Sequence, residues 1–141
     1  MKDSAVKITV TGRSGRESLD SVTTCANGRL YSKGGKRYLL YELPDESNPG
    51  IIVKHMMIFC SRHLEITKSA PGLKTRILYE PGAGTETDYS TPYGSLTLVF
   101  STKSMTVTET EEMLEIEIAY DIFSGGELLS ENLLLIDCVS E

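Results

Sequence analysis

The sequence contains few cysteines, few histidines and no long apolar segment, and these shortages exclude several classes of protein. Cys25, Cys60 and Cys138 are widely and irregularly spaced, which fits neither a disulfide framework nor a C-x-x-C redox pair. We expect buried, reduced thiols, because free cysteine packs as a small hydrophobe. No apolar run has the length of a membrane helix, and the opening residues MKDSAVKITV lack the apolar core of an export signal. We therefore expect a cytoplasmic protein that does not contact a membrane.

The chain has only two histidines, His55 and His63, and this shortage argues against metal and triad chemistry. On one straight strand the two would lie roughly 26 Å apart, and together with Cys60 they match no structural zinc spacing. No Ser-His-Asp or Cys-His arrangement can be identified. Segment 81–85 contains glycines but lacks the Gly-Lys-Ser/Thr ending and the helix start of a phosphate-binding loop. We expect no metal, no cofactor and no catalytic residues.

Basic residues are scarce in the second half of the chain. Residues 1–76 hold 13 basic and 7 acidic residues, a net charge of +6, whereas residues 77–141 hold only Lys103 against 13 acidic residues. In a closed barrel the two halves would share strand neighbours, and their charges would pair across the sheet. The alternative is that this bipolar surface mediates self-association, for example as a homodimer. Nucleic acid is not an expected partner, because the net charge is −6 and no basic stripe with interleaved aromatic residues is present.

The sequence does contain apolar alternation with the period of a β-strand. It is longest over residues 95–110, where the apolar residues are even-numbered up to Phe100 but odd-numbered at Met105 and Val107. One extra residue within 101–104, a β-bulge, would restore a single apolar face. A strand of about sixteen residues would span roughly 50 Å if straight. We therefore expect it to curl, as barrel strands do.

Dipeptides rich in glycine predict tight turns that fix strand register. Asn27-Gly28 predicts a hairpin after a strand over residues 18–26, and Gly34-Gly35 predicts the next turn, with Leu30 opposite Leu39. The pattern leaves open which face of this meander points inward.

The whole chain contains about ten candidate strands and no convincing helix, with short turns between successive strands. This pattern predicts a single all-β domain over residues 1–141. We predict an antiparallel up-and-down β-barrel of about 8–10 strands, because closing the sheet removes its exposed edges. A two-sheet sandwich is the alternative.

Several short motifs resemble the YwiB-like family of small uncharacterised bacterial proteins. They are Tyr79-Glu80-x-Gly82, Tyr89-x-Thr91-Pro92-Tyr93-Gly94, the region of Thr102, Ala119-Tyr120, and Gly126-Glu127 through Ser130-Glu131-Asn132. The resemblance implies a calycin-like (lipocalin-type) barrel and implies no activity. True lipocalins also begin with a Gly-x-Trp motif, which this tryptophan-free chain lacks.

Polar residues expected near one end of the barrel suggest a binding site. The Gly125-Gly126 hairpin predicts that Tyr120 faces Glu131 on the inward side, near Lys103 or Thr102 of the neighbouring strand. We interpret the segment from Pro81 to Gly94 either as a plain connection or as a mobile flap over the barrel mouth. The predicted ligand contacts are Arg76, Tyr89, Tyr93, Tyr120 and Glu131.

Two functional hypotheses follow from the sequence, and they rank ahead of a third, an enzyme. The first is a non-enzymatic barrel that binds a small, partly apolar ligand in its interior. The second is a homo-oligomeric interaction module whose barrel is packed solid with side chains. A cavity of several hundred Å³ would favour the first hypothesis, and large interior residues would favour the second.

Overall fold

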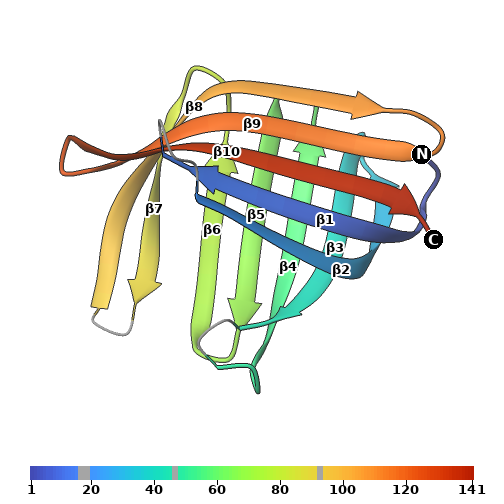
Figure 1. The fold of residues 1–141 in the computed structure, drawn as a ribbon, viewed down its shortest axis with the longest axis horizontal. Helices are drawn as coiled ribbons and strands as arrows, with labels where there is room; N and C mark the ends of the chain where they lie inside the picture. Colours follow the sequence, from blue (N-terminus) through green and yellow to red (C-terminus); the bar gives the residue numbers. More distant parts are fainter. Residues whose placement is uncertain (16–19, 46–47, 92–93) are drawn as a thin grey trace.

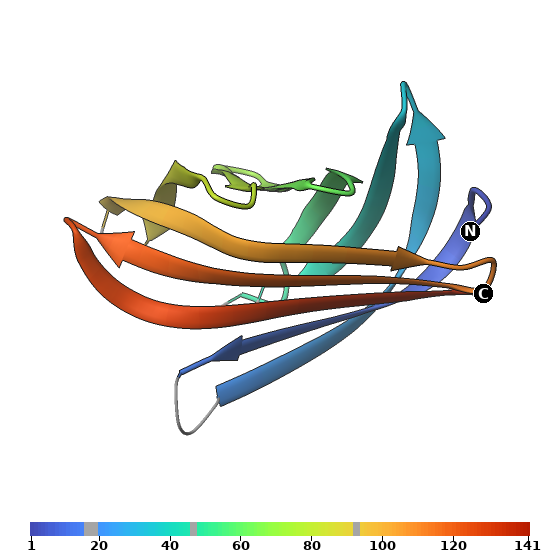
Figure 2. The same cartoon turned by 90° about the horizontal axis from the view of Figure 1, so that it is seen from above.

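The computed structural model describes residues 1–15, 20–45, 48–91 and 94–141, and in it ten antiparallel strands curl into one nearly closed barrel (Figures 1 and 2). The strands are β1 (Ser4–Ser14), β2 (Asp20–Lys33), β3 (Lys36–Pro44), β4 (Ile52–Cys60), β5 (His63–Ala70), β6 (Leu73–Tyr79), β7 (Gly84–Thr91), β8 (Gly94–Glu109), β9 (Met113–Ser124) and β10 (Glu127–Ser140). The described residues contain no helix. The predicted all-β antiparallel barrel is confirmed, and the two-sheet sandwich is wrong because all ten strands belong to one sheet.

The strand order is β6-β5-β4-β3-β2-β1-β10-β9-β8-β7, so the first strand pairs with the last. In that ladder Val6 lies opposite Ser140. Strands β6 and β7 are consecutive in the chain yet form the two ends of the sheet, and no ladder joins them. Two threonine hydroxyls of β7 link them instead: Thr85 Oγ1 donates to the carbonyl of Leu78 at 2.7 Å, and Thr87 Oγ1 to that of Arg76 at 3.2 Å. We call this junction the β6/β7 seam.

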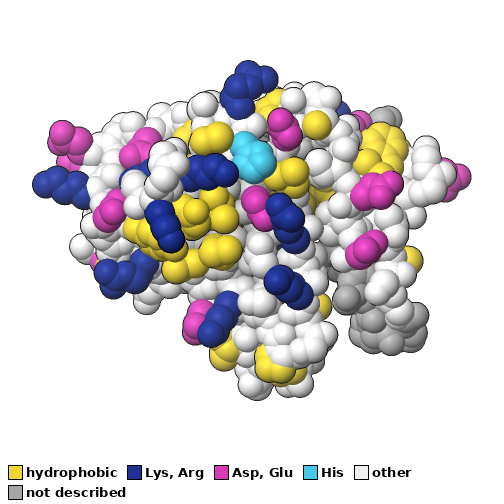
Figure 3. Space-filling model, turned by 180° about the vertical axis from the view of Figure 1, so that it is seen from behind, with side chains coloured by type: hydrophobic (Ala, Val, Ile, Leu, Met, Phe, Trp, Pro, Cys, Tyr) yellow, Lys and Arg dark blue, Asp and Glu magenta, His cyan; other side chains and the backbone are white. Residues whose placement is uncertain are grey.

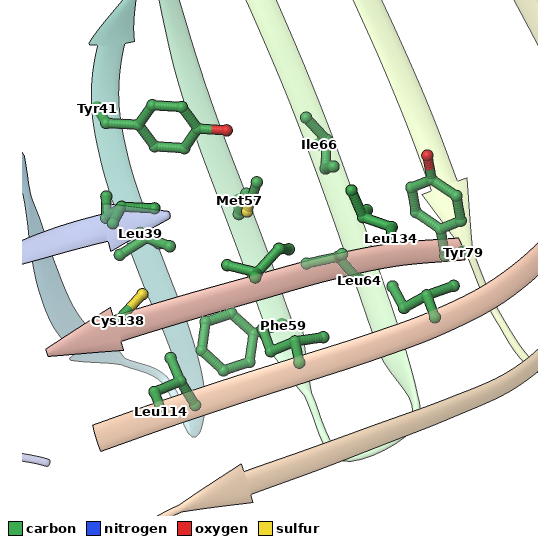
Figure 4. Close-up of a cluster of buried hydrophobic side chains, with 14 of the residues drawn as sticks. Leu39, Tyr41, Met57, Phe59, Leu64, Ile66, Tyr79, Leu114, Leu134 and Cys138 are labelled. Atoms are coloured by element: carbon green, nitrogen blue, oxygen red, sulfur yellow. The ribbon is translucent and has the colours of Figure 1, made fainter. Parts of the chain in front are cut away.

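One half of the barrel interior is filled with apolar side chains. Successive inward positions of β9 and β10, including Leu114, Ile116 and Ile136, are almost completely buried. They form one cluster with Leu39, Met57, Phe59 and Leu64 of the opposite wall, and Figure 4 shows Leu114 and Cys138 in this cluster. This packed half supplies most of the apolar burial that stabilises the fold.

Ion pairs close the end of the barrel beyond this core. The Met1 amino group lies 2.6 Å from Glu109, and Arg37 lies 3.3 Å from both Glu109 and Asp3. These contacts join the start of the chain to the end of β8.

The predicted turn at Asn27-Gly28 is wrong, because β2 runs straight through both residues. A Cβ atom at Gly28 would overlap the carbonyl oxygen of Leu40 and the side chain of Ile8. The glycine therefore permits a close approach of neighbouring strands inside the sheet rather than a turn. The Gly34-Gly35 turn and the pairing of Leu30 with Leu39 are confirmed.

Two register shifts distinguish β8 and β10. The predicted bulge in β8 is confirmed, with the shift lying between Thr102 and Ser104. A second bulge, between Leu128 and Ser130, was not predicted and moves the β9/β10 register by one residue. The predicted pairing of Tyr120 with Glu131 is therefore wrong: Tyr120 lies opposite Asn132, while Glu131 lies opposite Asp121. A one-residue shift transfers a side chain to the other face of a strand.

Two other expectations are also corrected. The segment from Pro81 to Gly94 is neither a plain connection nor a flap, because most of it forms β7, which pairs with β8. Of the three cysteines only Cys138 is buried, whereas Cys25 and Cys60 are exposed on the outer face. All three are free thiols, as expected.

Candidate functional site

The half of the barrel opposite the ion pairs contains a cavity of about 940 Å³ that is open to solvent. Some of the inward residues in this half are small. Gly12, Thr24 and Thr75 are among them. Pro44, Asp45 and Pro49 border the cavity at the rim. A solidly packed interior, as in the second hypothesis, is therefore present in one half of the barrel only.

A row of polar side chains crosses one wall of this cavity. Tyr41 of β3 lies opposite His55 of β4, His55 opposite Lys68 of β5, and Lys68 opposite Thr75 of β6. Residues paired directly across strands lie on the same face, and all four line the cavity. We call these four residues the polar row.

Apolar residues lie on both sides of the polar row. Two positions deeper, Leu39, Met57, Ile66 and Ile77 form a continuous cross-strand row that belongs to the core. Two positions nearer the rim, Leu43 lies opposite Val53, and Leu73 lines the cavity on β6. The polar groups of this wall are therefore concentrated at one depth.

The opposite wall is mostly apolar and partly aromatic. It is formed by Val10, Leu98, Phe100, Tyr120, Ile122 and Leu134. Tyr120 stacks on Phe100 with ring centroids 5.7 Å apart and meets the edge of Tyr79 at 4.9 Å. Figure 4 shows Tyr79 beside Leu134 at the margin of the packed core. These rings form a rigid boundary between the core and the cavity.

Burial sets the protonation states in the polar row. Burial, aided by the positive charge of Lys68, lowers the pKa of His55 from 6.5 to about 4. Burial also raises the pKa of Tyr41 far above its usual value, with a smaller contribution from Cys138. The two rings stack, with centroids 4.6 Å apart and planes at 15°. At neutral pH the imidazole is therefore neutral and the phenol keeps its proton.

One nitrogen of His55 is unsatisfied. Its Nδ1 atom is buried and forms no hydrogen bond with any residue that the structure describes. A buried polar atom without a partner is costly by about 1–3 kcal/mol. A ligand that hydrogen-bonds this atom would recover part of that cost.

The predicted site residues are not brought together. Tyr120 lines the cavity, as predicted. Arg76 lies on the outer face, largely exposed, and forms an ion pair with Glu65. Glu131 lies beside Asp121 on the outer face, 3.9 Å from Lys103. The Tyr89 side chain and all of Tyr93 lie outside the described residues.

The polar row is not apparent from the sequence, because its four residues lie on four different strands and become neighbours only through strand pairing. The signal was present in the turns at Ser61-Arg62 and Pro71-Gly72, which fix the register across β4, β5 and β6. In the sequence His55 suggests only a metal ligand, because its cross-strand neighbours are not apparent. Within the described residues no cluster of three or more His, Cys, Asp or Glu side chains could hold a metal ion.

Comparison with solved structures identifies a protein of the same fold. The crystal structure of the YwiB protein from Bacillus subtilis matches with a TM-score of 0.84 and 22% sequence identity, over 100% of this chain and 94% of that one. At this identity the match establishes the fold alone. The relation to calycins stays a prediction. Among the described residues, no helix has the length and apolar character needed to cross a membrane.

Sequence comparison gives a family but no activity. No curated protein matches the chain significantly. The family model described as a domain of unknown function (DUF1934) matches residues 6–136, which is nearly the whole chain. The resemblance noted from the short motifs is thereby confirmed, and the chain belongs to the DUF1934 family.

Proposed function

We propose that this chain is a cytoplasmic, non-enzymatic barrel that binds a small, partly apolar molecule in its interior. The observation that carries the proposal is the open cavity of about 940 Å³, lined mainly by apolar side chains with a few convergent polar groups. Ligand sites in proteins typically have roughly this volume and this composition. The neutral His55 and protonated Tyr41 suit hydrogen bonding to a ligand, and a pKa of about 4 makes His55 a weak base at neutral pH.

Native mass spectrometry of the protein purified from cells tests this proposal. We expect an adduct of small-molecule size that survives gentle ionisation and leaves on denaturation. An Ile122→Trp variant fills the cavity and should lose the adduct. Phe123→Trp, which enlarges the neighbouring side chain of β9 outside the cavity lining, is the matched control and should keep it. An adduct that persists in Ile122→Trp would contradict binding in the cavity.

A second candidate function, a homo-oligomeric interaction module, is favoured by the distribution of charge. The sheet order keeps the six strands of the basic half together and the four strands of the acidic half together. Their charges can therefore pair across a ladder only where β1 meets β10, and the predicted pairing throughout the sheet is wrong. The outer surface is bipolar as a result.

The basic half also carries an apolar area on its outer face. Tyr38 lies opposite Ile58 and Leu40 opposite Met56, all of them partly exposed. Figure 3, which looks onto this side, shows Lys and Arg side chains around an apolar area. The acidic outer strip of a second copy, including Glu115, complements it in charge.

Sedimentation velocity at low and high salt distinguishes this second function. Self-association through opposite charges should give a dimer at low salt that dissociates at high salt, because salt screens exposed charges. A monomer at both salt concentrations would refute it.

A further inference from the structure

The polar row brings four polar side chains together at one place in the cavity. On the wall from β3 to β6 its four residues lie at a single depth, with apolar rows above and below. Across the cavity stand Val10, Leu98 and Ile122, and the hydroxyl groups on that side, those of Thr24 and Tyr120, carry no charge. An anionic group held against that wall would have no positive charge beside it. Binding is therefore favoured in one orientation, with the polar end against the row.

The row is rich in donors and contains no carboxylate. Lys68 has three N–H donors and a positive charge, Thr75 contributes a hydroxyl, and Tyr41 contributes a phenol that keeps its proton. His55 adds the buried Nδ1 atom that has no partner among the described residues. Because an ammonium has three donors, Lys68 can bind a ligand while keeping the contacts it makes within the protein. Such a set recognises an acceptor, and its charge favours an anion.

The carboxylate of Asp45 belongs to a different level of the cavity. It follows the end of β3, four residues beyond Tyr41. At the rise of a strand this is about 13 Å along the wall, at the rim. Its negative charge therefore acts on the entrance and not on a head group held at the row.

We propose that the molecule bound in the cavity is an amphipathic anion with a head group of the carboxylate type. The head group is held by Lys68, Thr75 and Tyr41, and the apolar part lies against Met57, Ile66 and Ile77. The proposal rests on the proposed binding function, and it adds the chemical class of the ligand and the orientation in which it is bound.

Three probes of equal chain length test the head group. Octanoate, 1-octanol and octylammonium each contain eight carbon atoms in one unbranched chain and end in a negative, a neutral and a positive group, respectively. Isothermal titration calorimetry near neutral pH should give octanoate the highest affinity, roughly tenfold or more above octanol, which corresponds to one charge-assisted hydrogen bond. Octylammonium should bind most weakly, because its charge repels Lys68.

Two lysine variants test whether Lys68 causes the preference for octanoate. Lys68→Met removes the charge and keeps an unbranched side chain of similar length, so the preference for octanoate over octanol should disappear while octanol affinity stays unchanged. Lys74→Met removes an exposed lysine of the neighbouring strand and should change neither affinity. Tyr41→Phe should weaken octanoate only a few-fold, since it removes one donor.

The outcomes separate this inference from the proposed function. Equal affinities for octanoate and octanol, or a preference that survives Lys68→Met, overturn the anionic head group and leave the binding barrel standing. A cavity that takes up none of the three probes overturns both. A preference for octanoate that is lost in Lys68→Met, reduced in Tyr41→Phe and kept in Lys74→Met supports the assignment.

Discussion

Removing His55 should change how stability depends on pH. Burial and Lys68 lower the pKa of this imidazole from 6.5 to about 4, so the unfolded chain binds a proton at a higher pH than the folded protein does. The stability contributed by the neutral ring is therefore complete above about pH 6.5 and is lost as the pH falls toward 4. We expect His55→Gln to abolish this part of the pH dependence.

The magnitude follows from the size of the pKa change. A fall from 6.5 to about 4 corresponds to at most about 3 kcal/mol. The ring is partly exposed and water screens its charge, so we expect about 1–2 kcal/mol. Urea denaturation of wild type and His55→Gln between pH 4 and pH 7 gives the difference in the free energy of unfolding at each pH. Carboxylates titrate in both proteins, and their contribution cancels in that difference.

A second variant tests the cause of the shift. Lys68→Met removes the positive charge near His55, which is the smaller of the two causes of the lowered pKa. The loss of stability on acidification should therefore be smaller than in wild type but still present. A difference between wild type and His55→Gln that does not vary with pH would refute the reasoning, because it would mean that the folded protein binds the proton as readily as the unfolded chain.

Three further predictions concern packing, reactivity and the seam. Gly28→Ala should destabilise the protein by about 1–3 kcal/mol in urea denaturation because the new methyl overlaps Leu40 and Ile8, whereas Gly12→Ala, where no atom lies within 4 Å of the new Cβ, should not. Burial raises the pKa of Cys138 to about 12, so a thiol reagent at neutral pH should modify the two exposed cysteines and spare this one; rapid modification of all three would contradict the buried position. Thr87→Val should cost about 1 kcal/mol and speed amide exchange along β6 and β7, and unchanged exchange would show that the threonine contacts do not hold the seam.

The alternation of apolar and polar residues predicted those features of the fold that lie within single strands. It located β1, β8 and β9, and the switch from even to odd apolar positions located the bulge at Thr102 and Ser104. Strand β7 was not predicted, because its inward residues include Thr85 and Thr87. Apolar and polar positions therefore do not alternate along it. A strand whose buried side chains are hydroxylated gives no period-2 signal.

Features set by contacts between strands were not predictable in the same way. Gly28 appears as half of a turn signal, and only the closeness of Leu40 and Ile8 reveals why it is glycine. The bulge near Leu129 changes neither composition nor period, yet it moves Glu131 to the outer face. The polar row likewise depends on register across four strands, which a linear pattern does not specify.

The β6/β7 seam also determines where this chain could be cut if its two termini were joined. Starting from β7, the sheet runs β7-β8-β9-β10-β1-β2-β3-β4-β5-β6, so a circular permutant cut at residues 80–83 would place every strand next to its sequence neighbour. Figure 1 shows the two termini close together, and the amide of Glu141 donates to the carbonyl of Ala5 at 3.2 Å, so a short linker would join them. The cut breaks no ladder, and among the described strands the only pairing between strands far apart in the sequence, β1 with β10, becomes a hairpin. Because local contacts speed folding, the permutant should fold faster than the natural order while forming the same barrel.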